Sequence, residues 1–213
     1  MNDVVGTKPH RLRRAVLWII ACAAVLGGTA WLLSVANPSR WIDPRIIAED
    51  EESDRRSREL EQNLPAAISR IRPVGEPWIM RIRDVDINAW IALRMPKWQQ
   101  HDPSLAWPIE GATAQVEFGE GCVTIRIAAH QRIWSGTFTP TVEAGSIHLD
   151  PGWGAVGMLP VPGGASLASR LMEGDAAKNL SLPSIFKLGD GRQVEVRRID
   201  LVGGAVEIEC VTR

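Results

Sequence analysis

The stretch that decides the fold runs from Ala114 to Ile127 and reads A-Q-V-E-F-G-E-G-C-V-T-I-R-I. Apolar and polar residues alternate on both sides of its central Gly-Glu-Gly. The apolar members of the two runs are Ala114, Val116, Phe118, Val123, Ile125 and Ile127. Alternation with a period of two gives each strand one apolar face, and a glycine-rich break between two such runs is typical of a hairpin. The stretch therefore predicts two antiparallel strands that share a buried face.

The chain after this hairpin repeats the pattern of strand, glycine turn and strand. The expected strands lie at 132–142, 146–150, 185–188, 193–201 and 206–210. The last two are joined at Gly203-Gly204, a favourable hairpin turn. Residues 164–178 indicate a helix, with apolar positions at Leu167, Ala168, Leu171 and Met172.

A strand and a helix precede the hairpin. Residues 78–83 alternate like a half-buried strand, and the segment 87–95 repeats apolar residues at helical spacing until Pro96 ends it. This spacing predicts that Ile87, Trp90 and Ile91 pack on the sheet. The expected fold class is α+β, with a curved antiparallel sheet packed against one or two helices in an outer domain of residues 76–213.

An apolar segment near the N-terminus predicts a membrane anchor. Residues 15–36 are 22 residues without a charge, and at about 1.5 Å each they span a hydrocarbon core of about 30 Å. The basic residues of the tail, 1–14, precede this segment, whereas acidic residues follow it. This bias predicts a single-pass protein of the cell (inner) membrane, with its tail in the cytoplasm and its domain outside, in the periplasm.

Two alternatives for this segment stay open. Ser34-Val35-Ala36 matches a signal-peptidase site, although the segment is longer than the apolar region of about 7–15 residues that is typical of a cleaved leader. Ile19-Ile20-Ala21-Cys22 matches a lipobox with Cys22 as the lipidated residue, but the chain stays apolar beyond it. The length favours a retained anchor.

Residues 37–75 are expected to form a largely helical stalk. Asp43-Pro44 is a favourable helix start. Beyond it, acidic residues precede arginines at i,i+4 spacing, and apolar residues are sparse between Ala48 and Leu60. The pattern predicts a solvated helix that breaks at Pro65. A short second helix would then dock on the domain through Leu64, Ile68 and Ile71.

Charge and motifs argue against nucleic acids and nucleotides as partners. The chain has 24 Lys plus Arg against 25 Asp plus Glu, so it carries no excess of cations with which to neutralise phosphates. Residues 152–157 match the G-x-G-x-x-G fingerprint, whose third glycine must open a helix, yet Pro160 and Pro162 fall in the first turns of that helix. We expect a loop here, with extended backbone at Leu159 and Val161.

Neither a catalytic group nor a metal site is predicted. Ser166 lacks the final glycine of a nucleophile elbow and is interpreted as a helix N-cap, and His148 as a solvent-facing strand residue. Cysteine and histidine spacings do not match a zinc site. Cys210 shares the apolar face of its strand, whereas Cys122 shares the polar face of its own, which disfavours a disulfide between them. The expectation is a protein that is not an enzyme and has no cofactor.

Three sequence features together resemble a known group of proteins. They are Asp84-Val85-Asp86-Ile87-Asn88-Ala89-Trp90-Ile91-Ala92, the turn Gly157-Met158-Leu159-Pro160-Val161-Pro162 and the final Gly203-Gly204 hairpin. In this order, across residues 76–213, they resemble single-pass bacterial envelope proteins of the YpmS-like kind, which are similar to tubular lipid-binding domains. The resemblance implies a curved sheet around a long helix, a lipid-binding role and no catalytic residues. The charged stalk and the segment from Trp98 to Pro108 depart from the pattern.

Two functions from different classes are therefore expected. In the first, the outer domain binds lipid or another apolar envelope component in a groove. The candidate groove residues are Ile87, Trp90, Ile91, Phe118 and Phe138. In the second, the domain is an interaction or scaffold subunit of an envelope complex and has a closed core. An apolar cavity of more than about 300 Å³ would favour the first, and a filled core with an exposed apolar patch would favour the second.

Overall fold

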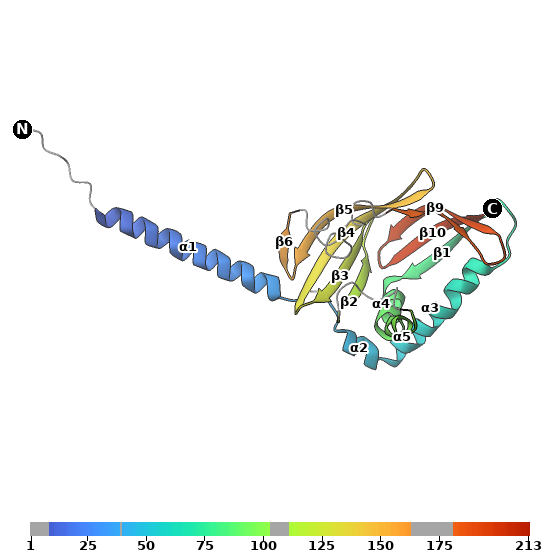
Figure 1. Cartoon of the computed structure of the whole chain (residues 1–213), viewed down its shortest axis with the longest axis horizontal. Coiled ribbons are helices and arrows are strands. Elements are labelled where there is room, and N and C mark those ends of the chain that lie inside the picture. The colour runs from blue at the N-terminus through green and yellow to red at the C-terminus, as the bar shows by residue number, and fades with distance from the viewer. Residues whose placement is uncertain (1–8, 39, 103–110, 163–180) are drawn as a thin grey trace, which may run out of the picture.

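The computed structural model describes residues 9–38, 40–102, 111–162 and 181–213 (Figure 1). An apolar N-terminal helix leads into two antiparallel sheets that pack with helices. The predicted α+β class is confirmed. The predicted helix at 164–178, with Ser166, lies outside the described residues.

The N-terminal helix, α1 (Pro9–Val35), begins before the predicted apolar segment. The basic residues of the tail are good helix formers, so they extend the helix toward the N-terminus. Within α1, the part from Trp18 to Val35 is long and apolar enough to cross a membrane. The helix is compatible with a single-pass anchor and also with a signal sequence. Figure 1 shows it projecting from one end of the domain.

Two helices follow, and an aspartate caps each of them. α2 (Pro44–Glu49) begins after Asp43, whose carboxylate accepts from the backbone N–H of Arg45 at 2.9 Å. α3 (Glu51–Ser69) begins after Asp50, whose carboxylate accepts from the N–H and the hydroxyl of Ser53 at 2.9 and 2.6 Å. These bonds satisfy N–H groups that have no partner within the helix.

The solvated stalk that the sequence predicts is not confirmed, because α3 packs along helix α4 (Asp84–Leu93). Serines at i,i+4, Ser53 and Ser57, are buried on α3. Ser57 is fully buried, and its hydroxyl donates to the carbonyl of Asp54 at 2.8 Å, so its polar atom is satisfied. Small polar residues do not register in an apolar pattern, which explains why the packing face of α3 was missed.

α3 continues through Pro65, so the predicted break is wrong. Pro65 removes one backbone hydrogen bond, but the helix is continuous across it. The C-terminal end of the helix is also fastened to the domain. The guanidinium of Arg192 donates to the carbonyls of Ser69 and Arg70 at 2.6 and 3.1 Å. α3 is thus an integral layer of the folded domain.

The first sheet joins the earliest strand of the domain to the latest ones, in the antiparallel order β1-β10-β9-β8. Its strands are β1 (Pro77–Arg83), β8 (Ile185–Lys187), β9 (Gln193–Val202) and β10 (Ala205–Thr212). β9 and β10 turn at Gly203-Gly204, as predicted. The pairing of β1 with β10 joins segments that are distant in the chain, which local patterns do not reveal.

The second sheet contains the predicted hairpin and has the order β2-β3-β4-β5-β6. Its strands are β2 (Thr113–Phe118), β3 (Val123–Ala129), β4 (Arg132–Glu143), β5 (Ser146–Val156) and β6 (Leu159–Val161), and β7 (Ser181–Pro183) pairs with β5. One curved antiparallel sheet was predicted. The strands instead divide into two sheets, neither of them strongly curled.

The glycine motif at 152–157 lies in β5 and the turn after it, so the predicted loop is wrong. A Cβ on Gly152 would lie 2.6 Å from the hydroxyl oxygen of Thr137, so glycine lets β5 run close to β4. Leu159 and Val161 are extended, as predicted, and lie in β6. A strand thus follows the third glycine where the nucleotide fingerprint needs a helix.

The main core lies where both sheets meet α4. Phe118, Val123, Phe138 and Val206 are buried there, and Ile87 of α4 packs against them. The predicted helix at 87–95 is confirmed, since α4 covers most of it. A short helix, α5 (Met95–His101), follows, with Pro96 in its first turn.

Candidate functional site

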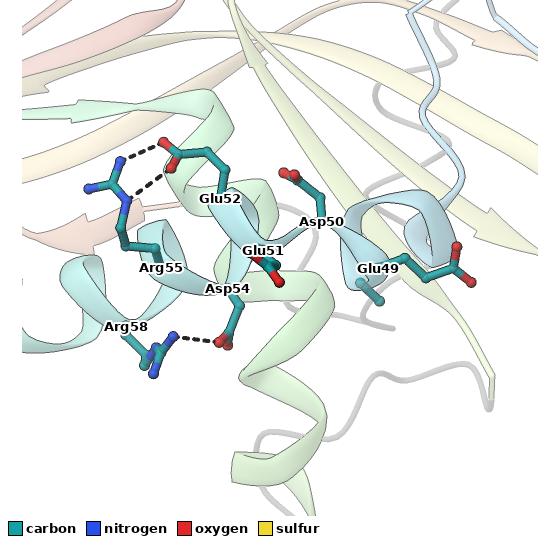
Figure 2. Close-up of a pocket in the computed structure, with 8 residues that line it drawn as sticks. Glu49, Asp50, Glu51, Glu52, Asp54, Arg55 and Arg58 are labelled. Carbon is teal, nitrogen blue, oxygen red and sulfur yellow. Dashed lines mark hydrogen bonds and ion pairs between the residues drawn. The ribbon is translucent and has the colours of Figure 1, made fainter.

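A wide hollow lies at the junction of α2 and α3, and charged residues line it (Figure 2). It measures about 840 Å³. Its lining residues are Ala48, Glu49, Asp50, Glu51, Glu52, Asp54, Arg55 and Arg58. Glu52 pairs with Arg55 at 2.6 Å and Asp54 with Arg58 at 2.7 Å, while Asp50 caps α3. These interactions stabilise the start of α3.

The electrostatics of this junction support a structural role. The hydrogen bond from the Ser53 side chain holds the pKa of Asp50 below its ordinary value, and the hydrogen bond from Arg55 does the same for the pKa of Glu52. Both carboxylates therefore stay ionised and paired. Within the described ranges, no group of three or more His, Cys, Asp or Glu side chains is placed to hold a metal ion.

A second cavity, between α3 and α4, has the opposite character. It measures about 290 Å³, is open on one side and is lined almost entirely by apolar side chains. Its lining residues are Leu60, Glu61, Leu64, Pro65, Ile82, Ile87, Trp90 and Trp98. One carboxylate belongs to the lining, and it is engaged: Glu61 accepts from the indole N–H of Trp98 at 2.6 Å. We call this cavity, bounded by α3, β1, α4 and α5, the apolar groove.

Helix geometry explains how α4 serves both the core and the apolar groove. At about 100° per residue, Trp90 lies about 60° from Ile87 in one direction and Ile91 about 40° in the other. Trp90 consequently faces α3 and the groove, whereas Ile91 packs on Ala114 and Ile127. Ile87 lies between them and contacts both regions. The predicted packing on the sheet holds for Ile87 and Ile91, but Trp90 lies against α3.

The apolar groove adjoins a second cavity of about 420 Å³, which we call the mouth. The mouth is lined by Glu61, Arg94, Lys97, Trp98, His101 and Asp102, so Glu61 and Trp98 belong to both spaces. Arg94 lies 3.6 Å from a carboxylate oxygen of Glu61 and 3.9 Å from one of Asp54. Its Nε is buried and has no hydrogen-bond partner. The Arg94 guanidinium thus keeps donor capacity for a further acceptor.

Two side-chain amides hold neighbouring segments against β2. Asn88 accepts from the N–H of Val116 at 2.7 Å and donates to its carbonyl at 2.8 Å. Gln115 makes a similar two-way pair with the backbone of Ile42, in the segment after α1. Asn88 thus takes the place of a neighbouring strand, and Gln115 holds the segment after α1. This polar region, which adjoins a cavity of about 360 Å³, is structural.

The structure brings together only some of the candidate groove residues. Ile87 and Trp90 line the apolar groove. Phe118 and Phe138 lie in the core, where they are 8% and 1% exposed, and Ile91 packs beside that core. Sequence reasoning missed the contributions of α3, β1 and α5 to the groove, namely Leu60, Leu64, Ile82 and Trp98. The i,i+4 pair of leucines on a charged helix was the available signal.

Comparison with protein families, with curated proteins and with solved structures finds no match for this chain.

Proposed function

We propose that this chain is a non-enzymatic, single-pass membrane protein whose outer domain binds one acyl chain of a lipid in the apolar groove. Its N-terminus lies in the cytoplasm, and residues 37–213 lie on the outer side of the cell membrane. The basic tail before α1 supports this orientation. The length of the apolar helix supports retention of the anchor.

The observation that carries the proposal is the unfilled apolar space between two packed helices. Ligand cavities are commonly about 300–1,000 Å³ and mostly apolar, with a few polar groups that orient the ligand. The apolar groove, at about 290 Å³, lies just below this range, and the mouth adjoins it. This volume fits a slender aliphatic chain better than a fused-ring ligand. Burial of such a chain gains about 0.8 kcal/mol per CH₂.

The mouth supports an amphipathic ligand over a plain hydrocarbon. Arg94 and Lys97 contribute positive charge, and Glu61 and Asp102 contribute negative charge. A polar headgroup can therefore find both donors and acceptors at the point where the acyl chain enters. The ion pairs of Arg94 with Glu61 and Asp54 are long, so its guanidinium can pair with a headgroup phosphate or carboxylate that binds there.

Tethering brings this groove close to a source of lipid. Residues 36–43 join α1 to α2, and even fully extended they reach no more than about 30 Å, at about 3.6 Å per residue. α3 follows α2 directly. The groove-bearing helices therefore stay near the membrane surface.

A titration of purified, delipidated protein with a fluorescent fatty acid and with a lysophospholipid tests the proposal. Leu64→Trp fills the apolar groove and should abolish saturable binding. Gln62→Trp places the same side chain on the exposed face of α3 and should leave binding unchanged. Equal binding by the wild type and Leu64→Trp would reject the groove as the site. An active periplasmic reporter fused after Arg213 is the expected result for the orientation.

A scaffold role is the second candidate. It is favoured by exposed apolar side chains at the end of the domain where α3 passes into β1. Ile71, Val74 and Ile79 are 84%, 78% and 61% exposed there. β1 is also an edge strand of its sheet. Loss of a co-purifying partner protein in Ile79→Lys, with lipid binding retained, would support this role.

A further inference from the structure

The turn between β5 and β6 contacts the last turn of α1. The N–H of Met158 donates to the carbonyl of Leu33 at 2.8 Å, and the N–H of Gly157 donates to the carbonyl of Ile133 at 2.7 Å. The turn is thus fastened to α1 on one side and to β4 on the other. Figure 1 shows β6 beside the end of α1.

The contact is close enough to require glycine. Gly157 has φ +60, and a Cβ there would lie 2.6 Å from the carbonyl oxygens of Leu33 and Ser34 and 2.7 Å from that of Ala36. Ser34 is buried at this contact, and its hydroxyl donates to the carbonyl of Trp31 at 2.8 Å. The last carbonyls of a helix have no partner within it, and the Met158 N–H supplies one.

A second contact limits the rotation of the domain about this point. The segment after α1 lies against β2, where Gln115 pairs with the backbone of Ile42 and Arg40 forms an ion pair with Glu117. The domain is therefore joined to α1 through the β5–β6 turn and through this segment.

The level of the turn along α1 determines what surrounds it. The uncharged segment 15–36 ends together with α1, and its 22 residues span about 33 Å, close to the hydrocarbon core of about 30 Å. Met158, bonded to Leu33, therefore lies at the level where that core ends. Its side chain is 53% exposed, and Trp31, a residue type favoured at membrane interfaces, is 57% exposed nearby on α1.

We propose that the β5–β6 turn is a second membrane contact, seated in the lipid headgroup layer with the Met158 side chain at the ends of the acyl chains. The phospholipid bilayer is the partner because the surface is continuous with the end of the membrane helix. The inference rests on the retained anchor of the proposed function and adds a fixed orientation of the domain on the membrane.

Spin-label accessibility in liposomes tests this inference on the full chain with Cys22 and Cys122 changed to alanine. Labels are placed at Met158→Cys, at Trp31→Cys in α1 and at Phe186→Cys. Phe186 is an exposed apolar residue on β8, near the C-terminal end that Figure 1 places far from α1. Labels at 158 and 31 should be relaxed by oxygen more than by a water-soluble nickel chelate. The label at 186 should show the reverse.

The three positions separate the two claims. A lipid-exposed label at 31 with a water-exposed label at 158 would overturn the second contact and leave the anchor standing. A water-exposed label at 31 would overturn both. Gly157→Ala should shift the label at 158 toward water, because the new methyl group displaces the turn from α1. Gly145→Ala, at a positive φ with nothing within 4 Å, is the matched control and should cause no shift. Equal accessibility of the label at 158 in both variants would also contradict the membrane contact of the β5–β6 turn.

Discussion

α4 separates two apolar regions that are filled in different ways. On the side of the sheets, Phe118 and Phe138 belong to a core in which Phe138 is 1% exposed. On the side of α3, Trp90 and Leu64 line a cavity of about 290 Å³. Both regions are built from large aliphatic and aromatic side chains. The difference shows that the arrangement of the neighbouring element, and not residue type alone, decides whether an apolar surface becomes core or groove.

The two neighbours of α4 differ in how they approach it. The sheets present alternating side chains from both of their layers, and these interdigitate around Ile87. α3 approaches as a single cylinder, with the small residues Ser53 and Ser57 in its first half and larger residues in its second. Small residues let helix axes come close, whereas Leu60, Leu64 and the two tryptophans enclose space between them.

Truncation in the closed region should have the largest effect on stability. Phe138→Ala removes a fully enclosed aromatic side chain and should lower the free energy of unfolding by about 3–5 kcal/mol. Lipid binding per folded molecule should not change, because Phe138 does not line the apolar groove. Urea denaturation measures the first quantity and fluorescent fatty-acid titration the second. A stability loss below about 1 kcal/mol would contradict a closed core.

Detaching α4 from the sheet should have the next largest effect. Asn88→Ala leaves the N–H and the carbonyl of Val116 without their side-chain partner and should cost about 1–3 kcal/mol. Asn88→Asp keeps the acceptor and loses the donor, so its cost should be intermediate. Thermal unfolding of the wild type, Asn88→Asp and Asn88→Ala should give melting temperatures that fall in this order. Equal melting temperatures would show that the amide does not hold α4.

A change at the mouth of the groove should affect binding more than stability. The ion pairs of Arg94 are long, 3.6 and 3.9 Å, and the attraction between two charges weakens as their distance grows. Arg94→Met should therefore leave the melting temperature nearly unchanged and weaken the binding of a lysophospholipid. Arg58→Met, on the exposed face of α3, is the control. Unaltered lysophospholipid affinity in Arg94→Met would show that the Arg94 guanidinium does not contact the ligand.

The smallest expected effect on stability at neutral pH comes from the buried thiol of Cys210. Burial raises the pKa of Cys210 from 9.0 to about 11. The folded state therefore holds the thiol proton more tightly than the unfolded state, and this contribution to stability is complete below pH 9 and is lost as the pH rises to 11. At pH 8, in a Cys22→Ala protein, a thiol reagent should modify the half-exposed Cys122 and spare Cys210. Modification of both at equal rates would indicate an open structure.

Local patterns predicted the local elements well. The alternation on both sides of Gly119-Glu120-Gly121 yielded β2 and β3, and the uncharged segment 15–36 yielded the apolar helix. Pairings between distant segments were not predictable, because nothing in the sequences of β1 and β10 indicates that these two strands pair with each other. The groove was predicted in part. Ile87 and Trp90 indicated the apolar face of α4, but the buried serines of α3 gave no apolar pattern, so α3 was not recognised as the helix that packs against this face.

Native mass spectrometry of the protein, purified in a mild detergent from its own membrane, tests the central claim most directly. The account predicts that the wild type carries one bound amphiphile with an acyl chain. Leu64→Trp should lack it and Gln62→Trp should retain it. A wild-type protein that shows only its own mass, before and after incubation with a lysophospholipid, would contradict the account, as would an adduct that persists in Leu64→Trp.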